Sequence, residues 1–142
     1  MESTDVNILS DNVRDFMLLA EICRGNEDDE DAQIAIQKAH KLQRRIVDKM
    51  RGEQPELIRQ HKIKAAATCC KIAQFFASEE LGRKDSGDRV IQFYSEALRF
   101  DDTNEKALLS LARIYLEREE LDQCMHQCIT LLRIDTEMKM PV

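Results

Sequence analysis

A recurring spacing of seven apolar or small residues constrains the fold of this chain more than any other feature. In residues 105–138 the seven are Leu108, Leu111, Ala112, Tyr115, Cys124, Cys128 and Leu131, at offsets 0, 3, 4, 7, 16, 20 and 23. The first four share one face of a helix, and the last three share one face of a second helix. This seven-point ladder predicts two helices joined by a tight turn, and the small Ala112 allows their backbones to approach closely.

The ladder occurs three times. An identical copy upstream consists of Phe16, Leu19, Ala20, Cys23, Ala32, Ile36 and Ala39. The middle copy consists of Cys69, Ile72, Ala73 and Phe76, followed by Val90, Tyr94 and Ala97, which come five residues later than the pattern requires. The extra five residues fall in segment 77–88, where Gly82 and Gly87 indicate a turn. Insertions in repeat proteins occur in loops, so the departure is consistent with a repeat.

Each ladder resembles the tetratricopeptide repeat. The resemblance rests on the run Leu111-Ala112-x-x-Tyr115 followed by a second helix with small apolar residues, although Thr136 and Cys124 replace the usual proline and alanine. It implies an all-α fold, a right-handed α-solenoid of three helix-turn-helix repeats with about six helices. We expect one domain at 10–138 with repeats at about 13–51, 66–104 and 105–138, between a flexible lead-in at 1–9 and a tail at 139–142.

Composition favours the same fold. With 4 glycines, 2 prolines and no tryptophan, the chain has few residues that interrupt helices. The net charge of −6 argues against nucleic-acid binding, which usually needs a basic excess. No apolar run is long enough to span a bilayer, and the first residues lack a signal-peptide pattern. The five cysteines are odd in number and lie mostly on the ladder, which favours a thiol-reducing, cytoplasmic location.

Capping and turn residues divide the chain into six helices. Ser10 or Asp11 is expected to cap the first, and Gly25 to provide the left-handed turn that ends it. Pro55 starts the third, and Asp88 is expected to cap the fourth. The expected ranges are about 10–24, 27–51, 55–80 and 88–100, then a fifth helix after the break at 101–104 and a sixth at about 121–134.

Two charged segments have functional alternatives. The acidic run 27–31 could bind calcium, but it lacks the alternating ligands and glycine of an EF-hand loop, so we favour a helix start stabilised by the helix dipole. A basic stripe in the second helix could contact an acidic partner or a lipid head group. An apolar stripe accompanies it, and we favour a solvated face. The basic residues are Lys38, Lys41, Arg45 and Lys49, and the apolar ones Ala39, Leu42, Ile46 and Met50.

No catalytic constellation is present in the sequence. It contains no glycine-rich phosphate loop, no H-E-x-x-H and no G-x-S-x-G, so we expect no enzymatic activity and no cofactor. Cys124 and Cys128 lie one helical turn apart and could hold zinc if two further ligands approached. Both lie on the ladder, as do Cys23 and Cys69, so we expect buried structural thiols that react slowly, and no metal.

A more specific resemblance is to the long tetratricopeptide-repeat subunit of intraflagellar transport complex A. It covers residues 13–138, and its most specific parts are the over-long second helix, the break at 52–55, and the spacing of Asp122, Cys124, Gln127 and Cys128. The inserted turn at 81–88 and the short length depart from that family. The resemblance implies a non-enzymatic ciliary scaffold for retrograde transport. Its partners would be other subunits of the complex, and its locations the cytoplasm, the cilium and the ciliary base.

The alternative function is a stand-alone cytosolic adaptor that binds a short peptide in the concave groove. A clamp for the acidic tails of chaperones is disfavoured, because Met17 and Glu21 occupy positions where that class needs lysine and asparagine, and Lys106 is only a partial match. By repeat geometry four rows line the groove. They are Arg14, Ala67 and Lys106; then Met17, Cys70 and Leu109; then Glu21, Gln74 and Arg113; and last Arg24, Ala77 and Leu116.

These rows favour an amphipathic or extended partner segment with a Leu or Phe anchor, because an apolar row is flanked by mixed charge. The alternative is that the same residues are merely solvated or covered by a neighbouring repeat. The sixth helix adds a second apolar face, which predicts contact with another repeat or self-association through exposed end repeats. That face consists of Leu121, Met125, Ile129 and Leu132.

Overall fold

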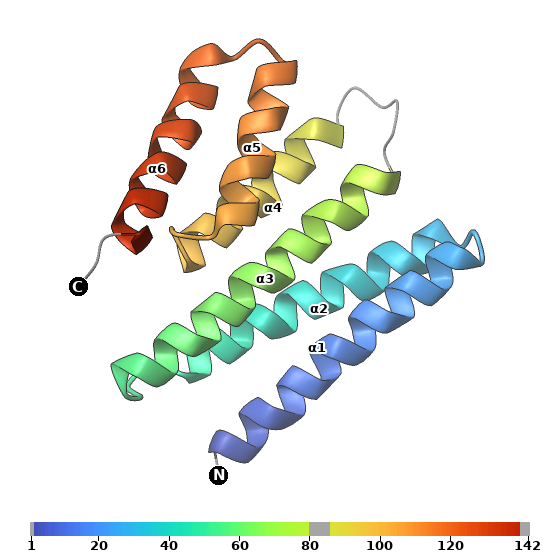
Figure 1. Cartoon of the computed structure of the whole chain (residues 1–142). Coiled ribbons are helices and arrows are strands. Elements are labelled where there is room, and N and C mark those ends of the chain that lie inside the picture. The colour runs from blue at the N-terminus through green and yellow to red at the C-terminus, as the bar shows by residue number, and fades with distance from the viewer. Residues whose placement is uncertain (1, 80–85, 140–142) are drawn as a thin grey trace. The chain divides into compact units, whose positions relative to one another are not determined.

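The computed structural model describes residues 2–79 and 86–139, and every regular element in these ranges is a helix (Figure 1). The bounds are α1 Glu2–Gly25, α2 Asp29–Lys49, α3 Pro55–Glu79, α4 Ser86–Phe100, α5 Glu105–Glu117 and α6 Leu121–Lys139. Consecutive helices pack side by side, α1 with α2, α4 with α5, and α5 with α6. The protein is therefore all-α, with the paired helices of a repeat protein. None of the described helices is long and apolar enough to cross a bilayer.

The chain divides into two compact units, Met1–Thr68 and Cys69–Val142, where the sequence analysis expects one domain. The first unit contains α1, α2 and the beginning of α3. The second contains the rest of α3 together with α4, α5 and α6. The division thus falls inside a continuous helix, three residues after the expected start of the middle repeat at 66.

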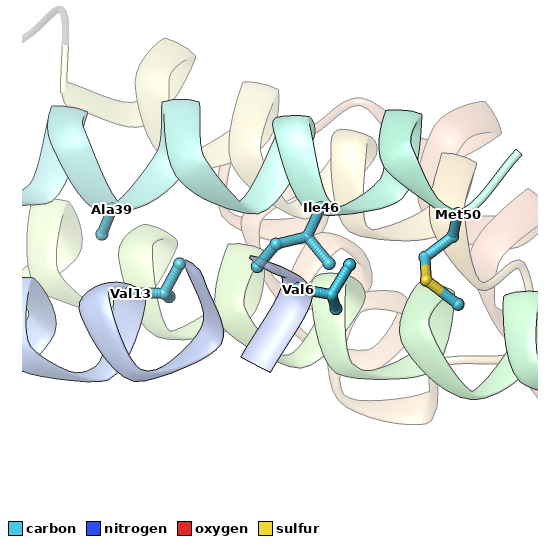
Figure 2. Packing of buried hydrophobic residues seen from close by; sticks show 5 residues of the cluster. All are labelled: Val6, Val13, Ala39, Ile46 and Met50. Atoms are coloured by element: carbon cyan, nitrogen blue, oxygen red, sulfur yellow. The ribbon is translucent and has the colours of Figure 1, made fainter. Parts of the chain in front are cut away.

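The core of the first unit lies between α1 and α2. Figure 2 shows five buried residues of one cluster in this core, Val6 and Val13 on α1 facing Ala39, Ile46 and Met50, which come from α2 and the residue that follows it. Further apolar residues that are partly buried pack against this cluster, namely Leu9, Phe16, Met17, Leu42 and Ile58. The apolar stripe predicted for residues 39–50 is therefore a core stripe. Lys38, Lys41 and Arg45 beside it are exposed, as expected of a solvated face.

α1 begins earlier than predicted. Residues 2–9, expected to be a flexible lead-in, are helical, and the Val6 side chain is 3% exposed. The reason is that Val6 and Leu9 continue the apolar stripe of Val13 and Phe16 at helical spacing, so one face can pack on α2 along its whole length. A polar composition in the first residues concealed this periodicity.

The turn between α1 and α2 also differs from the prediction. Gly25 is the last residue of α1, and the left-handed conformation falls on Glu27, at φ 62°. The acidic run then forms the helix start, because the Asp28 side chain accepts a hydrogen bond from the Asp31 N–H at 3.2 Å. A side-chain hydrogen bond with Asp28, followed by the charge of Asp28, raises the pKa of the Asp31 carboxyl.

α2 and α3 are separated by a short break. α2 ends at Lys49, two residues before the expected end, and Met50 is its C-cap, with a side chain that is 5% exposed. Gly52 takes φ 89°, a left-handed conformation that glycine adopts without strain. Pro55 opens α3 as predicted.

In the second unit, all seven ladder residues of the middle copy are buried: Cys69, Ile72, Ala73, Phe76, Val90, Tyr94 and Ala97. The Phe76 ring on α3 stacks on Phe93 of α4, with centroids 5.3 Å apart and planes 10° apart. The guanidinium of Arg89 lies over the Phe76 ring, 5.3 Å from its centroid. The middle ladder therefore packs as its spacing predicts, despite the five-residue shift.

The start of α4 and the end of α6 differ slightly from the expected ranges, whereas the end of α4 at Phe100 and the start of α6 at Leu121 agree with them. α4 begins at Ser86, and Asp88 in its first turn accepts a 2.7 Å hydrogen bond from Arg118 instead of serving as the cap. Most of the predicted inserted turn at 81–88 lies outside the described residues. α6 continues to Lys139, so the beginning of the predicted unstructured tail is helical, and residues 140–142 lie outside the description.

Ladder residues on the first and last helices are less buried than predicted. Leu19 is 45% exposed and Cys128 is exposed, whereas Cys23 and Cys124 are half-buried. The prediction of four buried thiols is therefore correct only for Cys69. A ladder residue needs helices on two sides to be covered completely, and no described helix precedes α1 or follows α6.

Candidate protein-binding surface

α5 carries the central part of the predicted groove. Its start is set by Asn104, whose side-chain oxygen accepts the N–H of Ala107 at 2.9 Å. Glu105 adds a negative charge in the first turn, where it interacts favourably with the helix dipole. One face of α5 is buried and consists of Ala107, Leu108, Leu111 and Ala112. This packing determines which side chains of the helix remain available to a partner.

The available residues form a stripe at helical spacing, called here the α5 stripe: Lys106, Leu109, Arg113 and Leu116, all exposed. Leu109 is 46% exposed and Leu116 is 58% exposed. Single exposed leucines are common on proteins, but two on one stripe with cations beside them make a surface that can anchor an apolar segment. The structure thus leaves exposed all four α5 residues that the sequence assigns to the groove.

The burial of Cys70 contradicts its predicted position in the groove. The sequence places it in the apolar row with Leu109, but its side chain is only 2% exposed and leaves almost no surface for a partner. Its thiol donates a hydrogen bond to the Asn104 side-chain oxygen, with 3.5 Å between Sγ and Oδ1. The reason is that α3 is covered on a wide face here, so the adjacent residues Cys69 and Cys70 are both buried.

The surroundings of Cys70 hold its thiol in the protonated form. Burial is the main cause and raises the pKa of Cys70 to about 11, because a thiolate would lose its hydration. The positive charge of Lys106 opposes this increase, and the negative charge of Asp101 adds to it. Cys70 and Lys106, predicted for adjacent rows, are therefore close enough to interact electrostatically.

On α1 the predicted groove residues have different environments. Arg14, Glu21 and Arg24 are exposed, and Arg14 donates a 2.6 Å hydrogen bond to Asp11, one turn earlier. Met17 is half-buried and packs against the core cluster of the first unit. Its contribution to a partner surface is therefore smaller than that of Leu109.

The remaining predicted positions are Ala67, Gln74 and Ala77, and all three are exposed. The predicted rows combine residues of both units, so rows that extend from α1 to α5 stay a prediction. Within the second unit, the α5 stripe is the exposed apolar surface that the sequence assigned to the groove.

α6 has one buried side and one exposed apolar side. Gln127 and Ile134 are each 8% exposed. The predicted end face is exposed, at 59% for Leu121, 60% for Met125, 50% for Ile129 and 66% for Leu132.

The sequence analysis missed the burial of Gln127, although its spacing from Cys124, Leu131 and Ile134 is that of one helical face. The pKa of the Cys124 thiol is raised, mainly by partial burial and secondly by a hydrogen bond with Cys128.

A second exposed apolar stripe, on α1, was also missed. This α1 stripe consists of Leu18, Leu19 and Ile22, with exposed fractions of 55%, 45% and 52%. The available signal was the pair of adjacent leucines, since only one of two neighbours on a helix can face the ladder partner.

Comparison with known proteins identifies one family. Residues 1–98 match the family model described as "Tetratricopeptide repeat protein 21 forth ARM domain". Tetratricopeptide repeat protein 21B of Homo sapiens is 34% identical over 133 residues, which is 94% of this chain. The Mus musculus 21B protein is 34% identical over 128 residues, or 90% of this chain, and human tetratricopeptide repeat protein 21A is 29% identical over 131 residues, or 92%. The matched segments span 10%, 9% and 10% of these relatives' own lengths.

Proposed function

The chain belongs to the tetratricopeptide repeat protein 21 family, and we propose that it is a protein-binding scaffold without catalytic activity in intraflagellar transport complex A. The paired helices and the family support a repeat scaffold. The assignment to the ciliary complex follows from the resemblance of residues 13–138 to its long tetratricopeptide-repeat subunit. On this proposal the protein occupies the cytoplasm, the cilium and the ciliary base, and its partners are other subunits of the complex.

The observation that supports binding best is the α5 stripe. α5 already buries four residues on its inner face, so its fold does not require the exposed Leu109 and Leu116. Burying these two leucines against a partner would remove apolar surface from water at about 25 cal/mol per Å². Leu109 and Leu116 on one stripe therefore provide apolar area that a partner can cover.

The charges on the stripe restrict the partner. Lys106 and Arg113 lie beside the leucines and are exposed. A partner segment that places Leu or Phe on the stripe and Asp or Glu next to these cations would satisfy both features. We therefore propose an amphipathic helix or extended segment with apolar anchors and a few acidic residues, rather than a uniformly acidic tail.

The test is Leu109→Glu. The substitution should leave folding intact, because Leu109 lies outside the buried face of α5, and it should reduce partner recovery at least tenfold, since a buried charge costs several kcal/mol. Tagged wild-type and variant chains would be used to recover proteins from extract of ciliated cells, with the complex A subunits quantified by mass spectrometry. Circular dichroism and thermal melting verify the fold.

Leu57→Glu is the matched control. Leu57 is 41% exposed at the start of α3, so the same change of charge and size occurs outside the α5 stripe. It should leave recovery unchanged. Equal recovery of complex A subunits by wild type and a well-folded Leu109→Glu chain would exclude the α5 stripe as the contact. Failure of the wild type to recover any of them would contradict the ciliary assignment.

A further inference from the structure

We propose that the basic stripe of α2, which is solvated in the free chain, is a docking surface for an acidic helix of a partner protein. This α2 basic stripe consists of Lys38, Lys41, Arg45 and Lys49. The inference concerns a different surface from the α5 stripe, and it does not depend on the ciliary assignment. It rests on the charges and the exposure of α1 and α2, which both belong to the first unit.

Positive charge is concentrated in the second half of α2. Residues 38–51 contain six lysines and arginines and one acidic residue, although the whole chain has a net charge of −6. The acidic residue, Asp48, forms an ion pair with Arg51, and the nitrogen and the oxygen are 3.5 Å apart. Arg51 lies outside the stripe, so this ion pair does not neutralise the cations of the stripe.

The stripe forms one exposed face of the helix. Its members are three or four residues apart, which places them on a different face from the buried residues of α2. Lys38, Lys41 and Arg45 are exposed, and Lys49 is half-buried. Within the part of the chain that the structure describes, neither Lys41 nor Arg45 forms an ion pair. The two central cations of the stripe are therefore available to a partner.

The stripe runs beside an acidic helix. The ammonium nitrogen of Lys38 lies 5.7 Å from the centroid of the Phe16 ring on α1, within the range of a cation–π interaction. The exposed residues of α1 include Asp11, Asp15 and Glu21. The positive surface is thus a narrow one, bordered by a helix that carries exposed carboxylates.

The stability of the fold does not explain the stripe. Lys41 is three residues after Lys38 and four residues before Arg45, and like charges at these spacings destabilise a helix slightly. Arg45 and Lys49 form another pair of this kind. Packing of the buried face of α2 on α1 offsets the cost. An acidic partner would replace the repulsions with attractions, so binding gives this arrangement a physical reason.

A helix fits the stripe better than other anionic partners do. Acidic residues three or four positions apart share one face of a helix, so each carboxylate can lie opposite one cation of the stripe. A membrane surface is broad and uniformly anionic. It would also approach the carboxylates of α1 and of the acidic run 27–31, which are exposed in the same unit. Charge complementarity therefore favours a single acidic helix.

Contacts between exposed charges are weak and sensitive to salt, so we expect a rapidly reversible complex. The Debye length falls from ~10 Å at about 0.1 M salt to ~3 Å at about 1 M salt. Binding should therefore be measurable at the lower salt concentration and lost at the higher one. Binding that persists at high salt would indicate an apolar contact and contradict the proposal.

The experiment uses the full chain and two synthetic alanine-rich helical peptides of identical composition as probes. In the one-faced peptide, glutamates repeat along one face at the spacing of the stripe. In the dispersed peptide, the same glutamates are distributed around the helix. Fluorescence anisotropy at about 0.1 M salt gives both dissociation constants. The one-faced peptide should bind at least about fivefold more tightly, and equal binding of the two peptides would overturn recognition by the stripe.

Lys41→Glu separates recognition from stability. It should weaken binding of the one-faced peptide about fivefold, because an attraction becomes a repulsion. It should also raise the free energy of unfolding slightly, since a glutamate four residues before Arg45 forms a favourable helical pair. Lys71→Glu is the matched control, because Lys71 is exposed on α3, and its binding should equal that of the wild type. Urea denaturation measures stability, and a Lys41→Glu chain that binds like the wild type would contradict the proposal.

Exchange of charges across the contact gives the sharpest result. Lys41→Glu combined with Arg45→Glu should prevent binding of the one-faced peptide, and circular dichroism verifies that the variant is folded. Replacing the two central glutamates of the peptide by lysines should restore binding to this variant and abolish binding to the wild type. Failure of the exchanged peptide to bind the variant would overturn the proposed pairing. A wild type that binds phosphatidylserine vesicles but neither peptide would overturn it in favour of a membrane surface.

Discussion

At the scale of single residues, Cys70 links two helices of the second unit through its hydrogen bond with Asn104. Its pKa is raised from the ordinary value of 9.0 to about 11, mainly by burial. Between these two pH values the folded chain keeps a proton that the unfolded chain has lost. The contribution of this buried thiol to the free energy of unfolding is therefore complete below pH 9 and is lost as pH rises through about 11.

We expect the free energy of unfolding of the wild type to fall over this pH range more steeply than that of Cys70→Ala. Urea denaturation of both proteins at several pH values on either side of 9.0 measures the difference. The comparison removes the contribution of other titrating groups, such as Tyr94, whose pKa is also raised by burial. Parallel pH profiles of the two proteins would show that the thiol ionises equally in both states.

At the scale of the helix, two caps of the same type differ in environment. Asn104 is half-buried and caps α5 while also accepting from Cys70, whereas Asp28 caps α2 in an exposed turn. We expect Asn104→Ala to cost about 1–2 kcal/mol and Asp28→Ala about 0.5–1 kcal/mol, because water can replace the exposed cap. Chemical denaturation of each variant gives both values. A larger loss for Asp28→Ala would contradict the role assigned to burial.

The first turns of α1 supply a second prediction at this scale. Val6 is 3% exposed in the core cluster, and Ile8, two residues later, is 52% exposed. Val6→Ala should therefore destabilise the protein by about 1–2 kcal/mol through lost burial and a small cavity. Ile8→Ala should change stability by less than about 0.5 kcal/mol. Equal and negligible effects of the two substitutions would mean that residues 2–9 do not contribute to the core.

At the scale of the whole molecule, each unit has a core of its own. The cluster around Ile46 draws on α1, α2 with the Met50 that follows it, and the start of α3, all within the first unit. We expect Ile46→Ala to cost about 3 kcal/mol and to accelerate amide hydrogen exchange in α1 and α2, with little change in α5. Hydrogen exchange followed by mass spectrometry resolves the helices. Uniform acceleration along the chain would indicate that both units unfold together.

The element types and most of the inner faces could be predicted from the sequence. Small residues such as Ala20, Ala73 and Ala112 recur at fixed offsets, and only helices bring such offsets to one face. All three are buried. The cap at Asn104 and the start at Pro55 follow from side-chain chemistry that acts within one turn, so they were also predictable from local sequence.

The degree to which each face is covered depended on tertiary structure. Periodicity shows that Leu19 and Cys128 belong to apolar faces, but their exposure depends on whether another helix lies beside them. Cys70 shows the converse, because neighbours on a wide face of α3 bury a residue that the repeat pattern assigns to the groove. Burial depends on contacts between helices far apart in the chain, and the spacing within one helix does not contain that information.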